Sequence, residues 1–125
     1  MTKFFLPLLF SLFIFACSRG NISKNSDLSI SNTDVIVFWG NGCPHCENVK
    51  KFIKDKQLDA KIKIKLIEVW NNTQNQDFMV KTIKENCQAI DTSKSVPVPF
   101  GFFVKDKKCE IGDQPINSRL KSMIK

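Results

Sequence analysis

Apolar positions along the chain form short runs, and these runs predict four strands. Residues 35–39 are continuously apolar and largely β-branched, which is typical of a strand buried on both faces at the centre of a parallel sheet. In residues 61–70 lysine alternates with apolar side chains, which predicts a strand at an edge, where exposed lysines discourage pairing with another chain. Residues 100–104 and 108–111 predict two further strands joined by a Lys-Asp-Lys turn.

Apolar residues that recur at helical spacing predict three helices. The first begins at Pro44, because proline suits the first helical position, and runs to about Leu58. The second spans roughly 73–89, and the third is opened by residues 112–115. The predicted apolar faces are Cys46, Val49, Phe52 and Ile53 in the first helix, Met79, Ile83, Cys87 and Ile90 in the second, and Ile116, Leu120, Met123 and Ile124 in the third. The element order is therefore β-α-β-α-β-β-α, an α/β domain.

Residues 1–16 have the pattern of an export signal. A short positive start is followed by an apolar run over 4–16, about 13 residues long, which fits a signal peptide better than a membrane span. The run ends in Ile-Phe-Ala-Cys, which resembles the lipobox of bacterial lipoproteins and implies a lipid on Cys17. Two alternatives stay open, namely ordinary cleavage after Ser18 and an uncleaved anchor.

All three alternatives place the folded domain outside the cytoplasm. Residues 17–33 are polar and lack periodicity, so we expect a lipidated N-terminus and a flexible linker with a reach on the order of 20 Å. The domain itself is predicted over 34–125, in the periplasm and tethered to a membrane. Ser18 after the lipobox cysteine resembles the pattern that sorts lipoproteins to the outer membrane of a Gram-negative cell.

The net charge of +7 changes this picture little. The lysines are scattered through predicted helices and one strand, with no single basic block interleaved with aromatic residues. We therefore expect no nucleic-acid partner, although a surface of one sign raises the rate of encounter with acidic proteins or lipid.

Candidate chemistry lies in Cys43-Pro44-His45-Cys46, where the first strand meets the first helix. A thiol at the N-cap faces unpaired N–H groups and the positive end of the helix dipole, both of which favour the thiolate, so Cys43 is the predicted nucleophile. Cys46 lies one turn inside the helix, where it can attack a mixed disulfide and release the substrate. A polar or protonated His45 further favours the Cys43 thiolate.

This motif, the element order and Val98-Pro99-Phe100 before the third strand together resemble the thioredoxin/glutaredoxin fold, over essentially all of 34–125. The resemblance implies a four-stranded mixed sheet with helices on both faces, and a redox-active disulfide with no bound cofactor. It also implies that Pro99 is the cis-proline facing the disulfide, with the Val98 backbone free to pair with a substrate strand. Pro97 is the rival, but a cis Pro97 would leave Pro99 inside a central strand, where it cannot donate to the ladder.

The resemblance implies a thiol-disulfide oxidoreductase that acts on cysteines of exported proteins, works with a redox recycling partner and is a monomer. Two other roles for Cys43 and Cys46 stay open. The first is an inert structural disulfide. The second is binding of copper or zinc, because small metal-handling domains also place C-x-x-C between a strand and a helix. Those domains have two strands after the first helix, whereas this chain predicts a second helix after its second strand. We expect no resident metal.

Three further residues carry open alternatives. Cys87 and Cys109 form a structural disulfide, stay independent thiols, or make a second redox pair. Trp39 ends the first strand close to the motif, where it either shapes a substrate-binding rim or packs in the core. Packing is the favoured interpretation.

Overall fold

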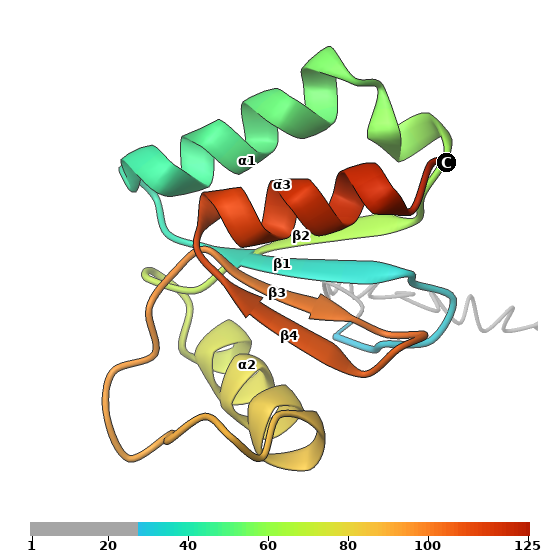
Figure 1. Cartoon of the computed structure of the whole chain (residues 1–125). Coiled ribbons are helices and arrows are strands. Elements are labelled where there is room, and N and C mark those ends of the chain that lie inside the picture. The colour runs from blue at the N-terminus through green and yellow to red at the C-terminus, as the bar shows by residue number, and fades with distance from the viewer. Residues whose placement is uncertain (1–27) are drawn as a thin grey trace, which may run out of the picture.

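A computed structural model describes residues 28–125 (Figure 1). The predicted signal peptide and the predicted lipid site at Cys17 lie outside this range. The elements are β1 (Val35–Trp39), α1 (Pro44–Asp55), a short 3₁₀ helix (Leu58–Ala60), β2 (Ile64–Glu68), α2 (Thr73–Asn86), β3 (Phe100–Phe103), β4 (Lys108–Ile111) and α3 (Asp113–Ser122). The predicted order is confirmed, with the 3₁₀ helix added after α1. In the part of the chain that the structure covers, no helix is long and apolar enough to cross a membrane.

The four strands form one mixed sheet in the order β2-β1-β3-β4. The central strand β1 pairs in parallel with β2, so that Phe38 lies opposite Ile67. On its other side β1 pairs antiparallel with β3, where Phe38 lies opposite Phe100. Because β1 and β2 are parallel, their carboxyl ends meet at the same edge of the sheet, and the predicted edge position of β2 is confirmed.

Helices cover both faces of the sheet, as the α/β pattern predicts. In Figure 1, α1 and α3 lie on one face and α2 lies on the other. Side chains of β1 alternate between the two layers: Val35 and Val37 pack with α1 and α3, whereas Ile36 and Phe38 pack with α2. Each face therefore has its own buried apolar cluster, and β1 contributes to both.

The first helix ends earlier than the pattern predicts. It stops at Asp55, Gln57 then takes a left-handed backbone with φ 51°, and Leu58 is fully buried in the 3₁₀ helix. In a continuous helix Leu58 would lie nine residues after the buried Val49, roughly 180° around the axis, and would point to solvent. Burial of Leu58 therefore requires the chain to turn before it.

Two other helix ends also differ. The second helix ends at Asn86, with Cys87 as its C-cap, and the last helix ends at Ser122. Met123 is 38% exposed and does not belong to the apolar face that the spacing predicts. Its predecessors Ile116 and Leu120 are fully buried, as expected.

Residues 28–33, the end of the predicted linker, contact the domain. Leu28 packs against the α2-side cluster, and Lys65 Nζ donates to the Ser29 carbonyl oxygen at 2.7 Å. Lys63 Nζ donates to Asn32 Oδ1. Lys65 in the edge strand β2 and Lys63, one residue before that strand, therefore hold residues 28–33 against the sheet.

Candidate functional site

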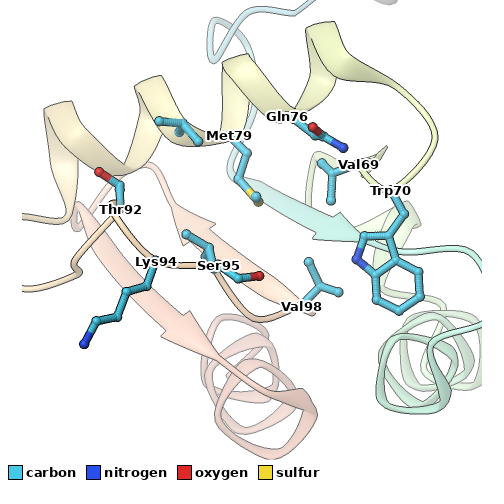
Figure 2. Close-up of a pocket in the computed structure, with 10 residues that line it drawn as sticks. Val69, Trp70, Gln76, Met79, Thr92, Lys94, Ser95 and Val98 are labelled. Atoms are coloured by element: carbon cyan, nitrogen blue, oxygen red, sulfur yellow. The ribbon is translucent and has the colours of Figure 1, made fainter.

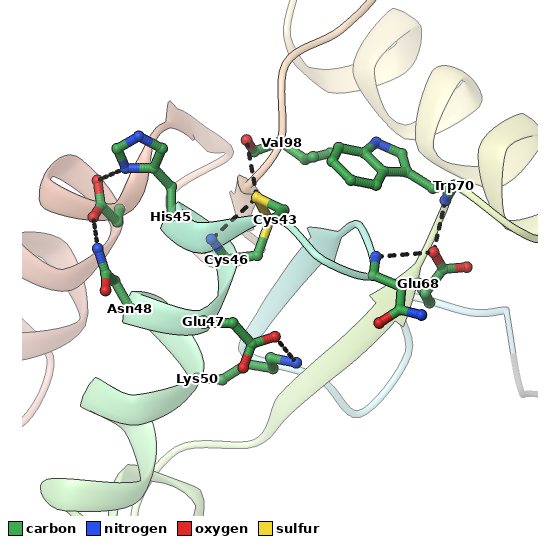
Figure 3. Close-up of a disulfide and its surroundings, with 11 residues drawn as sticks. Cys43, His45, Cys46, Glu47, Asn48, Lys50, Glu68, Trp70 and Val98 are labelled. Atoms are coloured by element: carbon green, nitrogen blue, oxygen red, sulfur yellow. Dashed lines mark hydrogen bonds and ion pairs between the residues drawn. A yellow bond between two sulfur atoms is a disulfide. The ribbon is translucent and has the colours of Figure 1, made fainter.

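The cysteine motif lies where β1 ends and α1 begins. The chain turns through residues 40–42, where Gly42 has φ 84°, a value that glycine adopts without strain. Cys43 is the N-cap of α1 and Pro44 follows in the first helical turn, as predicted. Cys43 and Cys46 form a disulfide with their Cα atoms 5.2 Å apart (Figure 3).

The surroundings of Cys43 favour a thiolate when the pair is reduced. The Cys46 N–H donates to Cys43 Sγ at 3.2 Å, so an unpaired amide of the first helical turn points at the sulfur. The helix dipole adds positive potential at the same place. Cys43 is 5% exposed and Cys46 is 1% exposed, so Cys43 is the more accessible sulfur-bearing residue. The geometry fits Cys43 as nucleophile and Cys46 as resolving cysteine.

His45 points away from the sulfurs toward the first turn of α3 (Figure 3). Its Nδ1 lies 3.3 Å from Asp113 Oδ1, and Asn48 Nδ2 donates to Asp113 Oδ2 at 2.7 Å. The Asn48 hydrogen bond holds the pKa of Asp113 below its ordinary value against the opposing effect of burial, and His45 lowers it further. One carboxylate therefore ties the start of α1 to the start of α3. Nothing in the sequence pattern links Asp113 to this motif.

This tie predicts a pH-dependent loss of stability in Asp113→Asn. Because the folded-state pKa of Asp113 is lowered, its stabilising effect is present above the unfolded pKa and is lost as pH falls through the folded one. At pH 7 we expect the free energy of unfolding to fall by about 1 kcal/mol. Urea titrations of both proteins at pH 7 and near pH 2 measure this. An equal deficit at both pH values would contradict the ionic explanation.

The segment opposite the disulfide contains the cis-proline. The Val98–Pro99 peptide bond is cis, and no other cis bond occurs within 28–125, so the choice of Pro99 over Pro97 is confirmed. Cys43 Sγ lies 3.8 Å from the Val98 carbonyl oxygen. The Gly112 N–H donates to the Pro99 carbonyl at 2.9 Å, which joins this segment to the start of α3.

The aromatic side chain beside Val98 is Trp70 (Figure 3), and both residues line one pocket. Trp39 is half-buried on the α1 side of the sheet, where Lys50 Nζ lies 3.8 Å from the centroid of its ring. Trp70 is 53% exposed and its indole packs on Gly40, where an added Cβ would overlap the ring. The sequence offered Trp39 as a rim residue, with core packing favoured, and indicated no rim role for Trp70. The parallel pairing of β1 and β2 is the signal that identifies it, because parallel strands end at the same edge.

Glu68 joins the two loops at this edge. Its carboxylate accepts hydrogen bonds from the N–H groups of Trp70 at 2.9 Å, Asn71 at 3.0 Å and Asn41 at 3.3 Å. Burial alone would raise the pKa of Glu68, but these N–H donors outweigh it and leave the pKa lowered. Glu68 therefore fixes the turn before Cys43 relative to Trp70.

Cys87 and Cys109 form a second disulfide, with Cα atoms 6.0 Å apart. The sequence leaves three alternatives open for Cys87 and Cys109. The structure shows the disulfide and excludes independent thiols. It links the C-cap of α2 to β4, and so anchors the start of the 87–99 connection that ends in the cis-proline. Among residues 28–125, no group of three or more His, Cys, Asp or Glu side chains could hold a metal ion.

A cysteine pair at a strand-to-helix junction, facing a cis-proline on a four-stranded mixed sheet, defines a thioredoxin-fold protein of thiol-disulfide chemistry. The family model described as Glutaredoxin matches residues 35–100, more than half of the chain, from β1 to the first residue of β3. The chain belongs to the glutaredoxin family. Comparisons with curated proteins and with solved structures give no match. The predicted fold and family are confirmed, and the family with its Cys43/Cys46 pair supports a thiol-disulfide redox function.

Proposed function

We propose that the protein is an exported thiol-disulfide oxidoreductase that exchanges disulfides with cysteines of other exported proteins. The observation that carries the proposal is the position of Cys43 Sγ, which receives the Cys46 N–H at the start of α1 and lies 3.8 Å from the Val98 carbonyl. The redox-active group is the Cys43/Cys46 pair itself, and the proposal includes no other cofactor.

Reduction of a client proceeds in two exchanges. The Cys43 thiolate attacks one sulfur of the client disulfide, a Cys43–client bond forms, and the other client sulfur leaves as a thiolate. The Cys46 thiolate then attacks Cys43 Sγ, which closes the 43–46 disulfide and releases the second client thiolate. Two electrons pass from the pair to the client. Oxidation of a client is the reverse sequence, and the reduction potential relative to the client sets the direction.

The backbone beside Pro99 supports a polypeptide as the client. None of the hydrogen bonds among residues 28–125 uses the Val98 N–H, and the Val98 carbonyl contacts Cys43 Sγ. An extended client segment can pair with these groups as an added strand does, which presents its cysteine to the sulfur.

The export part of the proposal rests on the sequence of residues 1–17. The apolar run and Cys17 favour a lipid tether, which keeps the domain at a periplasmic membrane surface, with the outer membrane preferred because Ser18 follows Cys17. A redox partner in the same compartment restores the pair after each cycle. Metabolic labelling with an alkyne fatty acid tests the tether: label is expected on the chain and absent from Cys17→Ala.

The redox proposal is tested by thiol-disulfide exchange between the full chain and a disulfide-bonded polypeptide, together with the equilibrium potential of Cys43/Cys46 in glutathione buffers. A potential of about −120 mV indicates a disulfide donor, and one of about −270 mV indicates a reductase. A pair that fails to exchange while the purified chain retains stoichiometric copper or zinc would overturn the proposal in favour of a metal carrier.

A further inference from the structure

Lysines that are scattered along the sequence gather at one end of the folded domain. The end of α1 with the 3₁₀ helix, the start of β2, the β3–β4 turn and the end of α3 lie together, away from the start of α1 (Figure 1). The strand register agrees, because Val35 at the start of β1 lies opposite Ile64 and Phe103, the first residue of β2 and the last of β3. Nine exposed lysines define this basic end: Lys54, Lys56, Lys61, Lys63, Lys105, Lys107, Lys108, Lys121 and Lys125.

The positive charge of the basic end is largely uncompensated. Within residues 28–125 none of its lysines forms an ion pair, whereas ion pairs do form at Lys50, Lys51, Lys81 and Arg119. The acidic residues that share this end are Asp34, Asp55, Asp59 and Asp106. Two of these already pair with cations outside the set, Asp55 with Lys51 and Asp106 with Arg119. The basic end therefore carries an excess of positive charge that faces solvent.

The β3–β4 turn adds charge where the backbone alone would favour another residue. Lys107 has φ 50°, a left-handed value that glycine adopts more easily than lysine. Lys105 and Lys108 are exposed on either side of it. Lysine at position 107 thus contributes surface charge at a cost to the turn.

Two further features of this end fit a membrane surface. Met123 is 38% exposed between Lys121 and Lys125, so an apolar side chain stands among cations, a combination that suits the headgroup region of a bilayer. Residues 31–34 lead into β1 at the same end. A lipid on Cys17 would therefore tether the domain through the end that carries the lysines.

The redox end has no such excess of positive charge. Glu47, Glu68 and Asp113 lie around the cysteine motif, together with Lys50, which is paired with Glu47 (Figure 3). Lys94 lies in the segment before the cis-proline (Figure 2). The five residues of β1 separate the two ends by about 17 Å, which exceeds the Debye length of about 8 Å at physiological salt. An anionic surface at the basic end would thus leave the redox site outside its screened potential.

We propose that the basic end binds anionic phospholipid headgroups and orients the tethered domain with its redox site away from the membrane. This inference rests on the exported, lipid-tethered form in the proposed function and adds the surface that meets the membrane. Each lysine near an anionic lipid surface strengthens binding by roughly fivefold. Several lysines at one end, with none in excess at the other, therefore favour one orientation over the rest.

The test is lysine footprinting of the mature chain, purified from membranes and reconstituted into vesicles. Acetylation rates of individual lysines are measured by mass spectrometry on phosphatidylcholine vesicles and on vesicles in which phosphatidylglycerol replaces about a third of the lipid. On the anionic vesicles we expect the lysines of the basic end to react at least about threefold more slowly, and Lys81 and Lys94 to keep their rates. High salt is expected to remove the protection, because it screens the headgroup charge.

A pair of matched variants separates the basic end from net charge. Lys105→Gln/Lys107→Gln removes two charges from the exposed turn, and Lys81→Gln/Lys94→Gln removes two exposed charges elsewhere. Protection of the remaining lysines of the basic end is expected to fall in the first variant and to persist in the second.

Absence of protection, equal protection of all lysines, or equal effects of the two variants would overturn the inference. Protection of the basic end by soluble polyglutamate but not by phosphatidylglycerol would overturn it in favour of an acidic protein partner. None of these outcomes bears on the proposed function. Absence of thiol exchange, or of fatty-acid label on the chain, would overturn the proposed function, and neither is read from the footprint.

Discussion

Cys46→Ser is expected to accumulate as a covalent adduct with a disulfide-bonded client, whereas Cys43→Ser is expected to form no such adduct. The reason is positional. Cys43 Sγ receives the helix N-terminal N–H and faces the Val98 segment, while Cys46 is 1% exposed and lies one turn inside α1. Without Cys46 the mixed disulfide has no internal thiolate to resolve it. Non-reducing electrophoresis and mass spectrometry of the adduct measure the outcome, and turnover should fall to the buffer rate in both variants.

Both variants are made in a Cys17→Ala background, so that the predicted lipid cysteine cannot form the adduct. Cys87 and Cys109 are paired with each other and serve as an internal reference. An adduct through Cys46 in the Cys43→Ser protein would reverse the assigned roles. Equal loss of bound copper or zinc in both variants, with no adduct in either, would support the metal-carrier alternative.

Removal of the Cys87–Cys109 disulfide is expected to lower the free energy of unfolding by about 3 kcal/mol, because the bridge closes a loop between cysteines 22 residues apart. For a small domain this is a large part of the total stability. Urea unfolding of oxidised Cys87→Ala/Cys109→Ala, compared with the parent chain, measures the loss.

A Cys43→Ser/Cys46→Ser parent isolates the effect of this bridge from that of the redox pair. In that parent, a reductant should lower stability by the same amount as the double alanine substitution. When Cys87→Ala/Cys109→Ala is introduced into that parent, reductant should leave the free energy of unfolding unchanged. Unchanged stability on removing the bridge would mean that packing of the buried Cys87 and its neighbours holds α2 to β4 without it.

The sequence predicted the architecture well, because the signals for it are local. The β1 run, the lysines near β2 and the proline after Cys43 each determine an element or its position by short-range chemistry. The ends of the helices were harder to predict from the sequence. Leu58 is apolar at a position where a continued helix would expose it, and only the tertiary packing shows that the chain turns there.

The residues of the candidate site also fall into two groups, those with a local sequence signal and those placed by tertiary packing. The two cysteines and the cis-proline were predictable, since motif and strand start occur together in the sequence. Trp70 and Asp113 reach the site from other elements, through strand pairing and through the packing of α3 on α1. The partner of Cys87 also depended on the register of β4 beside β3, which sequence spacing does not give.

The hydrogen bonds to Glu68 give the site a further property. A single carboxylate holds the turn before Cys43 and the loop of Trp70 in one arrangement, so these two segments lose less conformational entropy when a ligand binds beside them. Because the pKa of Glu68 is lowered in the folded state, this restraint is in place at neutral pH and is lost as pH falls through that value. Acidification would then release the turn before Cys43 and the loop of Trp70 together.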